Sequence, residues 1–62
     1  RESVVSEKDI IIGEKFSLDN IWVKRPSPKS GSIPAKDFKK IIGKIAKKNI
    51  NKDTQIKWED IQ

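Results

Sequence analysis

Short apolar clusters separated by polar turns recur along this chain, and the arrangement near the start returns near the end. Residues 4–21, VVSEKDIIIGEKFSLDNI, align without a gap with residues 44–61, KIAKKNINKDTQIKWEDI, at a constant offset of 40. Apolar positions fall on apolar positions: Val5 on Ile45, Ile10 on Ile50, Phe16 on Ile56 and Ile21 on Ile61. The pattern predicts two copies of one structural unit.

Each unit is expected to contain a short strand, a turn, a return strand and a local helical or 3₁₀ turn. The turn falls on Gly13 in one unit and on Asp53 in the other, and both residue types tolerate unusual backbone angles. The predicted strands are Val4–Val5, Phe16–Ser17, Ile45–Ala46 and Ile56–Lys57. The two units are predicted to pack about a pseudo-twofold axis around one small core of Val5, Ile10, Ile12, Phe16, Ile21, Ile45, Ile50, Ile56 and Ile61.

The segment between the two units predicts a loop followed by one short helix of about two turns. Proline and serine dominate residues 25–32, RPSPKSGS, which is typical of a loop. Ser32 is a candidate helix cap, Pro34 suits the first turn and Gly43 suits the C-terminal end. Apolar residues then follow helical spacing at Phe38, Ile41, Ile42 and Ile45.

The length of 62 residues allows one domain, 1–62, and a domain of this size buries only about 60% of its unfolded surface. The chain contains no Cys and no His, so neither a disulfide framework nor a typical zinc site stabilises it. It begins with Arg1 rather than Met, which suggests a piece of a longer protein. No apolar run approaches the length of a membrane span, and we expect no membrane partner.

The net charge of +5 comes mainly from lysine, which supplies 12 of the 14 cations. A diffuse lysine excess favours a solvated surface, and few aromatic side chains accompany it, so we expect no nucleic-acid partner. Without His or Cys we find no nucleophile-and-base constellation, and the chain alone is not expected to be an enzyme. The carboxylates of Asp19 and of Glu59–Asp60 fall at equivalent turns, and we interpret them as structural caps.

The stretch VKRPSPKSG, residues 23–31, leaves two interpretations open. Arg25 is the only internal arginine, and its planar guanidinium suits a carbonyl or carboxylate partner better than a lysine does. Pro26 stiffens the backbone directly after it. The residues alone slightly favour a solvent-exposed arginine at a strand end over a binding residue.

Several blocks in order, SVVSEKDIIIGEKFSLDNIWVKRP, IPAKDFKKIIGK and NINKDTQIKWEDI, resemble the antifreeze-like (SAF) domain at the C-terminus of sialic acid synthases. The resemblance covers nearly the whole chain. It implies a β-clip fold, as in type III antifreeze proteins: mostly β, with short helical or 3₁₀ turns and an internal pseudo-twofold repeat. The chain departs from the family at Ser27–Pro28, where a glycine is common, which puts the path of this loop in question.

The resemblance also implies a role. In these N-acetylneuraminate synthases a (β/α)₈ barrel, absent from this chain, condenses phosphoenolpyruvate with N-acetylmannosamine and uses a divalent metal, usually manganese. The SAF domain of one subunit of a homodimer covers the barrel of the other, so the partners expected here are its own barrel, the partner's barrel and the sugar. By this match Arg25 contacts the N-acetyl group of the sugar, which reverses the preference drawn from the residues alone. Lys24 and Pro26 are assigned to the supporting loop, and for Lys24 we favour the alternative that it only solvates this loop.

The resemblance places no catalytic residue, metal or cofactor in this domain. It predicts a cytoplasmic parent enzyme. The isolated domain is expected to be monomeric, because it is small, charged and free of cysteine and lacks its barrel. Two alternatives stay open: a non-enzymatic SAF module of an assembly or periplasmic chaperone protein, and, with less support, an ice-binding protein. Charged residues on the corresponding surface argue against ice binding, namely Lys8, Asp9, Lys15 and Asp19 together with Asn20.

Overall fold

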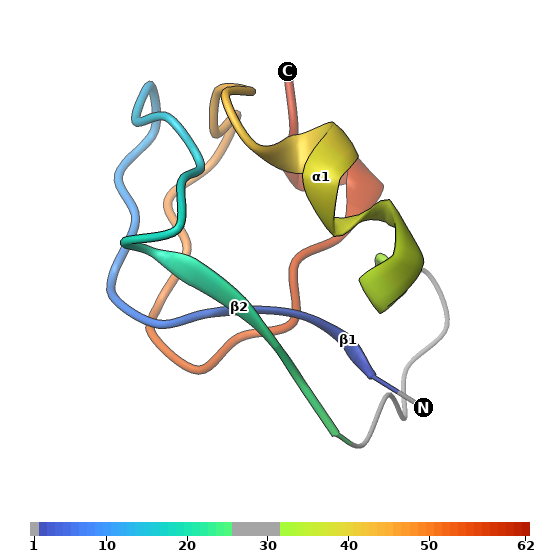
Figure 1. Ribbon diagram of the computed structural model, residues 1–62. Coiled ribbons are helices and arrows are strands. Elements are labelled where there is room, and N and C mark those ends of the chain that lie inside the picture. Colours follow the sequence, from blue (N-terminus) through green and yellow to red (C-terminus); the bar gives the residue numbers. More distant parts are fainter. Residues whose placement is uncertain (1, 26–31) are drawn as a thin grey trace.

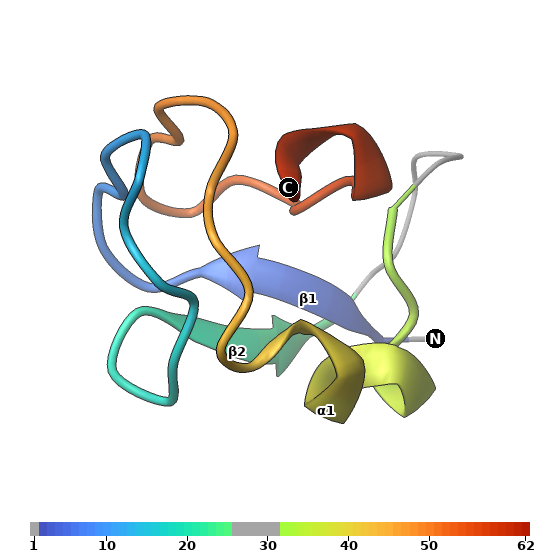
Figure 2. The same ribbon diagram turned by 90° about the horizontal axis from the view of Figure 1, so that it is seen from above.

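The computed structural model describes residues 2–25 and 32–62, and its regular elements are short (Figure 1). Strands β1 (Ser3–Ser6) and β2 (Ile21–Lys24) pair antiparallel, with Ser3 opposite Lys24 and Ser6 opposite Ile21. The other elements are the 3₁₀ helix η1 (Ala35–Asp37), the helix α1 (Phe38–Ile41) and the 3₁₀ helix η2 (Trp58–Asp60). In Figure 2, η2 lies on the far side of β1 from α1. The predicted mostly β class with short helical turns is confirmed.

The predicted repeat is present as a pseudo-twofold arrangement of backbone hydrogen bonds. Ile10 and Ile50 lie at its centre and donate to each other's carbonyl oxygens, at 2.7 Å in both directions. Other bonds occur in pairs, in which adding 40 to or subtracting 40 from the residue numbers of one bond gives the other. Ser6 N–H donates to Thr54 O (2.9 Å), and Ala46 N–H donates to Glu14 O (2.8 Å). Likewise, Phe16 N–H donates to Lys44 O (2.8 Å), and Ile56 N–H donates to Val4 O (2.9 Å). These bonds join the first unit to the second.

Of the four predicted strands one is present, two (Ile45–Ala46 and Ile56–Lys57) are reduced to isolated bridges and one is absent. Val4–Val5 lies within β1 as predicted, but Ile45 and Ala46 form only single bridges, to Lys15 and Ile61. Phe16–Ser17 is not a strand, since the bridge falls one residue earlier at Lys15. The chain turns again after a few residues in each unit, so continuous ladders cannot extend. Only β1 and β2 run side by side, antiparallel, for long enough to form a sheet.

The core is centred on the predicted apolar positions, with two corrections. Nine residues form it: Val4, Ile10, Phe16, Ile21, Ile33, Ile41, Ala46, Ile50 and Ile56, with Val23, Phe38 and Ile61 packed against them. The prediction of Ile12 as a core residue is wrong, since this residue is 60% exposed at the turn beside Gly13. Ile45 is only half-buried, and Ala46 next to it points inward instead. Ile33 and Ile41, from the segment between the repeats, complete the core.

The predicted helix is present but divided into η1 and α1. Gly43 ends it with a φ of 90°, as expected for a glycine after a helix. The predicted cap at Ser32 is wrong: Pro34 occupies the position before η1, with no side-chain cap. The Ser32 hydroxyl instead donates to Gln55 Oε1 at 3.0 Å, which links this segment to the second unit.

The turn caps are only partly the predicted carboxylates. Asp60 Oδ2 accepts a hydrogen bond from Lys57 N–H at 2.9 Å, which confirms its capping role. In the first unit the equivalent acceptor is Asn20, and the exposed Asp19 side chain makes no hydrogen bond with the described residues. Glu59 is also not a cap, and it lies 3.7 Å from Lys48 Nζ as a surface ion pair.

Candidate functional site

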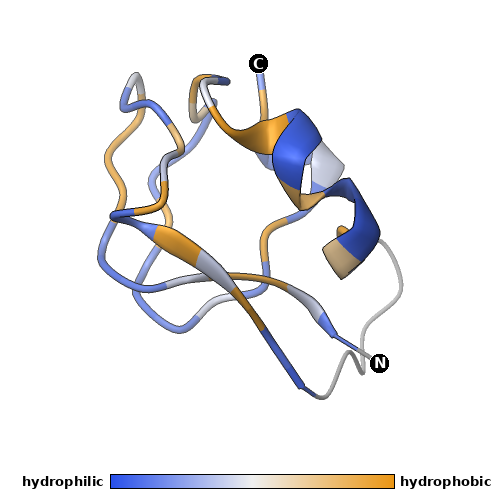
Figure 3. Ribbon diagram, viewed as in Figure 1, coloured by the Kyte–Doolittle hydropathy of each residue, from blue (hydrophilic) through white to orange (hydrophobic). Residues whose placement is uncertain are grey.

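The two basic residues of the candidate site lie at the end of β2. Lys24 is the last residue of this strand and Arg25 follows it, exposed to solvent. Figure 3 shows the end of β2 as hydrophilic, in contrast to its apolar beginning. The structure gives Arg25 no ion pair or hydrogen bond with any residue in 2–25 or 32–62. Pro26, also predicted for this site, lies outside the described residues.

Lys24 forms an ion-paired cluster that joins three segments. Its Nζ lies 3.1 Å from Glu7 Oε2, just after β1, and 3.2 Å from Asp53 Oδ1, in the turn of the second unit. Hydrogen bonds to Glu7 and Asp53 raise the pKa of Lys24. Lys24 is therefore not a freely solvated cation. It ties the end of β2 to the rest of the fold directly before Arg25.

Among the described residues, nothing pairs with the Arg25 guanidinium, so these residues leave it open to a ligand. Its five N–H donors form a planar fork that matches a carbonyl or carboxylate. The neighbouring Lys24 is held by two carboxylates, which anchors the end of β2. The Arg25 side chain, directly after it, faces solvent. The geometry is suited to contact with a polar group on another molecule.

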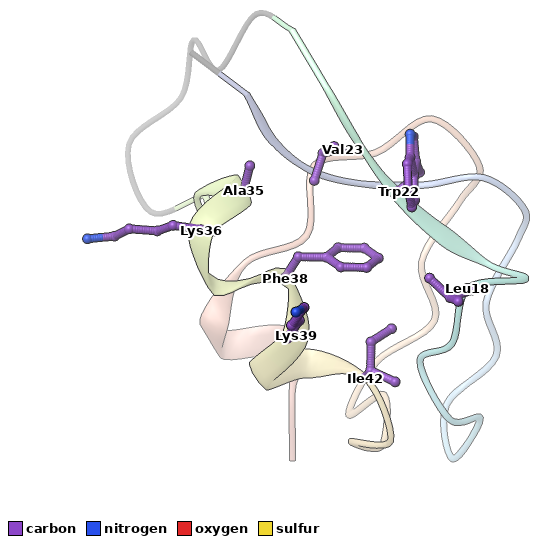
Figure 4. Close-up of a pocket in the computed structure, with 8 residues that line it drawn as sticks. All are labelled: Leu18, Trp22, Val23, Ala35, Lys36, Phe38, Lys39 and Ile42. Atoms are coloured by element: carbon purple, nitrogen blue, oxygen red, sulfur yellow. The ribbon is translucent and has the colours of Figure 1, made fainter.

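A second feature, which the sequence interpretation did not identify, is an open apolar groove of about 760 Å³ between β2 and the η1–α1 segment (Figure 4). It is lined by Leu18, Trp22, Val23, Ala35, Lys36, Phe38, Lys39 and Ile42. Trp22 and Phe38 meet edge to face, with ring centroids 5.5 Å apart at 81°. The available signal was that Leu18 and Trp22 are large apolar residues outside the predicted core.

The described residues contain no group of three or more metal-ligating acidic side chains. Within the same part of the chain, no helix has the length and apolar character needed to cross a bilayer.

The pseudo-twofold pattern of backbone hydrogen bonds and the short, irregular strands are typical of an antifreeze-like domain. Comparison with known proteins supports this class. The solution structure of an antifreeze-protein-like domain in human N-acetylneuraminic acid phosphate synthase superposes with a TM-score of 0.87 at 28% identity, covering 97% of this chain and 73% of that one. The family model of the SAF domain matches residues 1–62. The chain belongs to the SAF domain family.

A curated relative carries this domain within a much longer protein. The chain is 42% identical over 57 residues to N,N′-diacetyllegionaminic acid synthase of Campylobacter jejuni. The match covers 92% of this chain but only 16% of that synthase. The similarity thus concerns one small part of a large enzyme.

Proposed function

We propose that this chain is the substrate-capping SAF domain of a sialic-acid-type synthase and that Arg25 contacts the N-acetyl group of the sugar substrate. The exposed guanidinium at an anchored strand end is the observation that carries this proposal. The likeness to domains of two synthases, one for a legionaminic acid and one for an N-acetylneuraminic acid phosphate, gives the class of parent enzyme. These names support a nonulosonic acid product and an N-acetylated sugar substrate.

In this proposal the chemistry belongs to the rest of the synthase. The barrel carries the divalent metal and joins phosphoenolpyruvate to the sugar, and this domain closes over the barrel of the partner subunit in a homodimer. Arg25 donates hydrogen bonds to the N-acetyl carbonyl oxygen and so favours the N-acetylated sugar. The domain supplies binding and exclusion of water rather than a reacting group. The parent enzyme is proposed to act in the cytoplasm.

Lys24 and Pro26 have supporting roles in this proposal. Lys24, held by Glu7 and Asp53, keeps the end of β2 in place, so that Arg25 projects from a fixed backbone. Pro26 fixes its own φ directly after Arg25 and restricts Arg25 to extended backbone angles. Neither residue touches the sugar.

The test is the full-length synthase with Arg25→Ala, assayed with phosphoenolpyruvate and its N-acetylated sugar. Loss of a hydrogen bond from a charged group is worth about 1.5–3 kcal/mol, so kcat/KM for the sugar should fall by about 10- to 100-fold. The KM for phosphoenolpyruvate should stay the same. Arg25→Lys should recover only part of the loss, because an ammonium lacks the planar fork.

Two controls separate this contact from a general effect. Lys47→Ala removes another exposed cation and should leave kcat/KM unchanged. A mannose-type substrate without the N-acetyl group should react equally with wild type and Arg25→Ala, because the contact is missing in both cases. Unchanged turnover of the N-acetylated sugar by Arg25→Ala would contradict the proposal and leave the domain as a structural module.

A further inference from the structure

The groove between β2 and α1 exposes more large apolar surface than the fold requires. Leu18 is 68% exposed, Trp22 is 51% exposed and Ile42 is 38% exposed. The core is filled by other residues of the same segments, namely Ile21 and Ile41, both fully buried. Contiguous apolar surface of this kind in a small domain is typical of an interaction site.

The ionisable residues of the groove carry a single sign. Lys36 and Lys39 line it, and no carboxylate does. In Figure 4 the Lys36 ammonium extends away from the apolar centre formed around Phe38. An occupant that presents an apolar side chain flanked by carboxylates would therefore complement both the centre and the edge.

The groove is built on the strand that leads to the candidate site. Trp22 and Val23 line it, and Arg25 follows them on the same short segment. An occupant seated against Trp22 would therefore hold β2 in place together with Lys24, which holds the end of this strand through Glu7 and Asp53. Docking at the groove and placement of Arg25 are thus mechanically linked.

We propose that this groove is the docking surface for the catalytic part of the synthase and receives an apolar segment flanked by carboxylates. The occupant is chosen because the similar legionaminic acid synthase extends far beyond the 16% of its length that matches this chain. The groove's lysine edge and its continuity with Arg25 favour that same partner over a second copy of this domain, which carries a net charge of +5 itself. This inference rests on the proposed function.

The experiment compares Leu18→Lys with Ile12→Lys in the full-length synthase. Both residues are highly exposed and apolar, at 68% and 60%, but only Leu18 lines the groove. Small-angle scattering should show a larger radius of gyration for Leu18→Lys, as the domain separates from the barrel, and kcat/KM for the sugar should fall about 10-fold, equivalent to about 1.4 kcal/mol. Ile12→Lys should match wild type in both measurements.

A second pair tests the charge of the occupant. Lys39→Glu should weaken docking and lower kcat/KM, whereas Lys47→Glu, an equal charge reversal outside the groove, should not. Near-ultraviolet circular dichroism of each variant checks that the domain stays folded.

The outcomes separate the two proposals. If Leu18→Lys releases the domain while Arg25→Ala leaves turnover unchanged, the groove is confirmed and the sugar contact is wrong. If Arg25→Ala impairs turnover but Leu18→Lys and Lys39→Glu behave like their controls, the groove inference is overturned. A change of oligomeric state on sedimentation, with scattering that shows the domain still seated on its barrel, would instead assign the groove to a second copy and also overturn it.

Discussion

Asn20 and Asp60 occupy equivalent positions in the two units and perform the same capping task. Asn20 Oδ1 accepts a hydrogen bond from Ser17 N–H at 2.8 Å, and Asp60 Oδ2 accepts one from Lys57 N–H at 2.9 Å. The two side chains differ in what else they do. The Asn20 amide nitrogen donates to Glu14 Oε2 at 3.1 Å and to Lys15 O at 2.9 Å, in a site that is 3% exposed.

This difference predicts opposite tolerance to exchange of the two residue types. Asn20→Asp removes two donated hydrogen bonds and places a charge beside Glu14, so it should lower the free energy of unfolding by about 1–3 kcal/mol. Asp60→Asn keeps an accepting oxygen and should change the free energy of unfolding by less than about 1 kcal/mol. Urea denaturation of both variants checks this. Equal losses of unfolding free energy would show that Asn and Asp are equally tolerated at the two positions.

Gly13 has a φ of 94°, and its counterpart Asp53 has a φ of 63°. A Cβ built at Gly13 meets no atom within 4 Å, so the cost of a side chain there is a backbone cost alone. Gly13→Ala should therefore lower the free energy of unfolding by about 1–2 kcal/mol, and Gly13→Asn by less, since Asn tolerates positive φ better. Denaturation curves test this order. A neutral Gly13→Ala would mean that the turn readily adopts another conformation.

The Lys24 cluster predicts a dependence of stability on alkaline pH. Pairing with Glu7 and Asp53 raises the pKa of Lys24 above its usual 10.5. A raised pKa in the folded state stabilises the fold fully below the unfolded pKa, and this contribution disappears as the pH rises through the folded pKa. Lys24→Met should therefore melt at a slightly lower temperature than wild type near neutral pH, with the gap closing only above about pH 10.5.

Thermal melts of both proteins from about pH 8 to about pH 12 measure that gap. The gap should also narrow in high salt, because the cluster lies at the surface. A gap that is independent of pH would indicate that Lys24 acts through its aliphatic stem and not through its charge.

The antifreeze-like fold does not predict ice binding for this chain. Lys8, Asp9, Lys15 and Asp19 are all exposed, and their charges hold an ordered hydration shell that disrupts a flat match to ice. Asn20, which the sequence predicts on the same surface, is instead buried as a cap. We expect no thermal hysteresis at millimolar protein in a nanolitre osmometer. Measurable hysteresis would show that another face of the domain binds ice.

Local pattern was sufficient for the repeat and for much of the core. Apolar residues at a constant offset must be buried by the same kind of turn in both units, so Ile10, Ile50, Phe16 and Ile56 could be placed inside from the sequence. The left-handed turn positions at Gly13 and Asp53 followed as well, because few residue types accept such backbone angles. Side chains outside the repeat, such as Arg25, could be singled out from the sequence, but their position in the fold could not be predicted.

Only the tertiary structure decided which apolar residues stay outside and which polar groups meet. Ile12 lies outside the core, and Ala46 is buried in place of its neighbour Ile45, because burial depends on which way a turn faces, and this is set by the opposite unit. The contact of Lys24 with Asp53 joins residues 29 apart, and the groove joins Leu18 to Ile42. Such sites arise from packing between distant segments, so composition and spacing specify their residues but not their proximity.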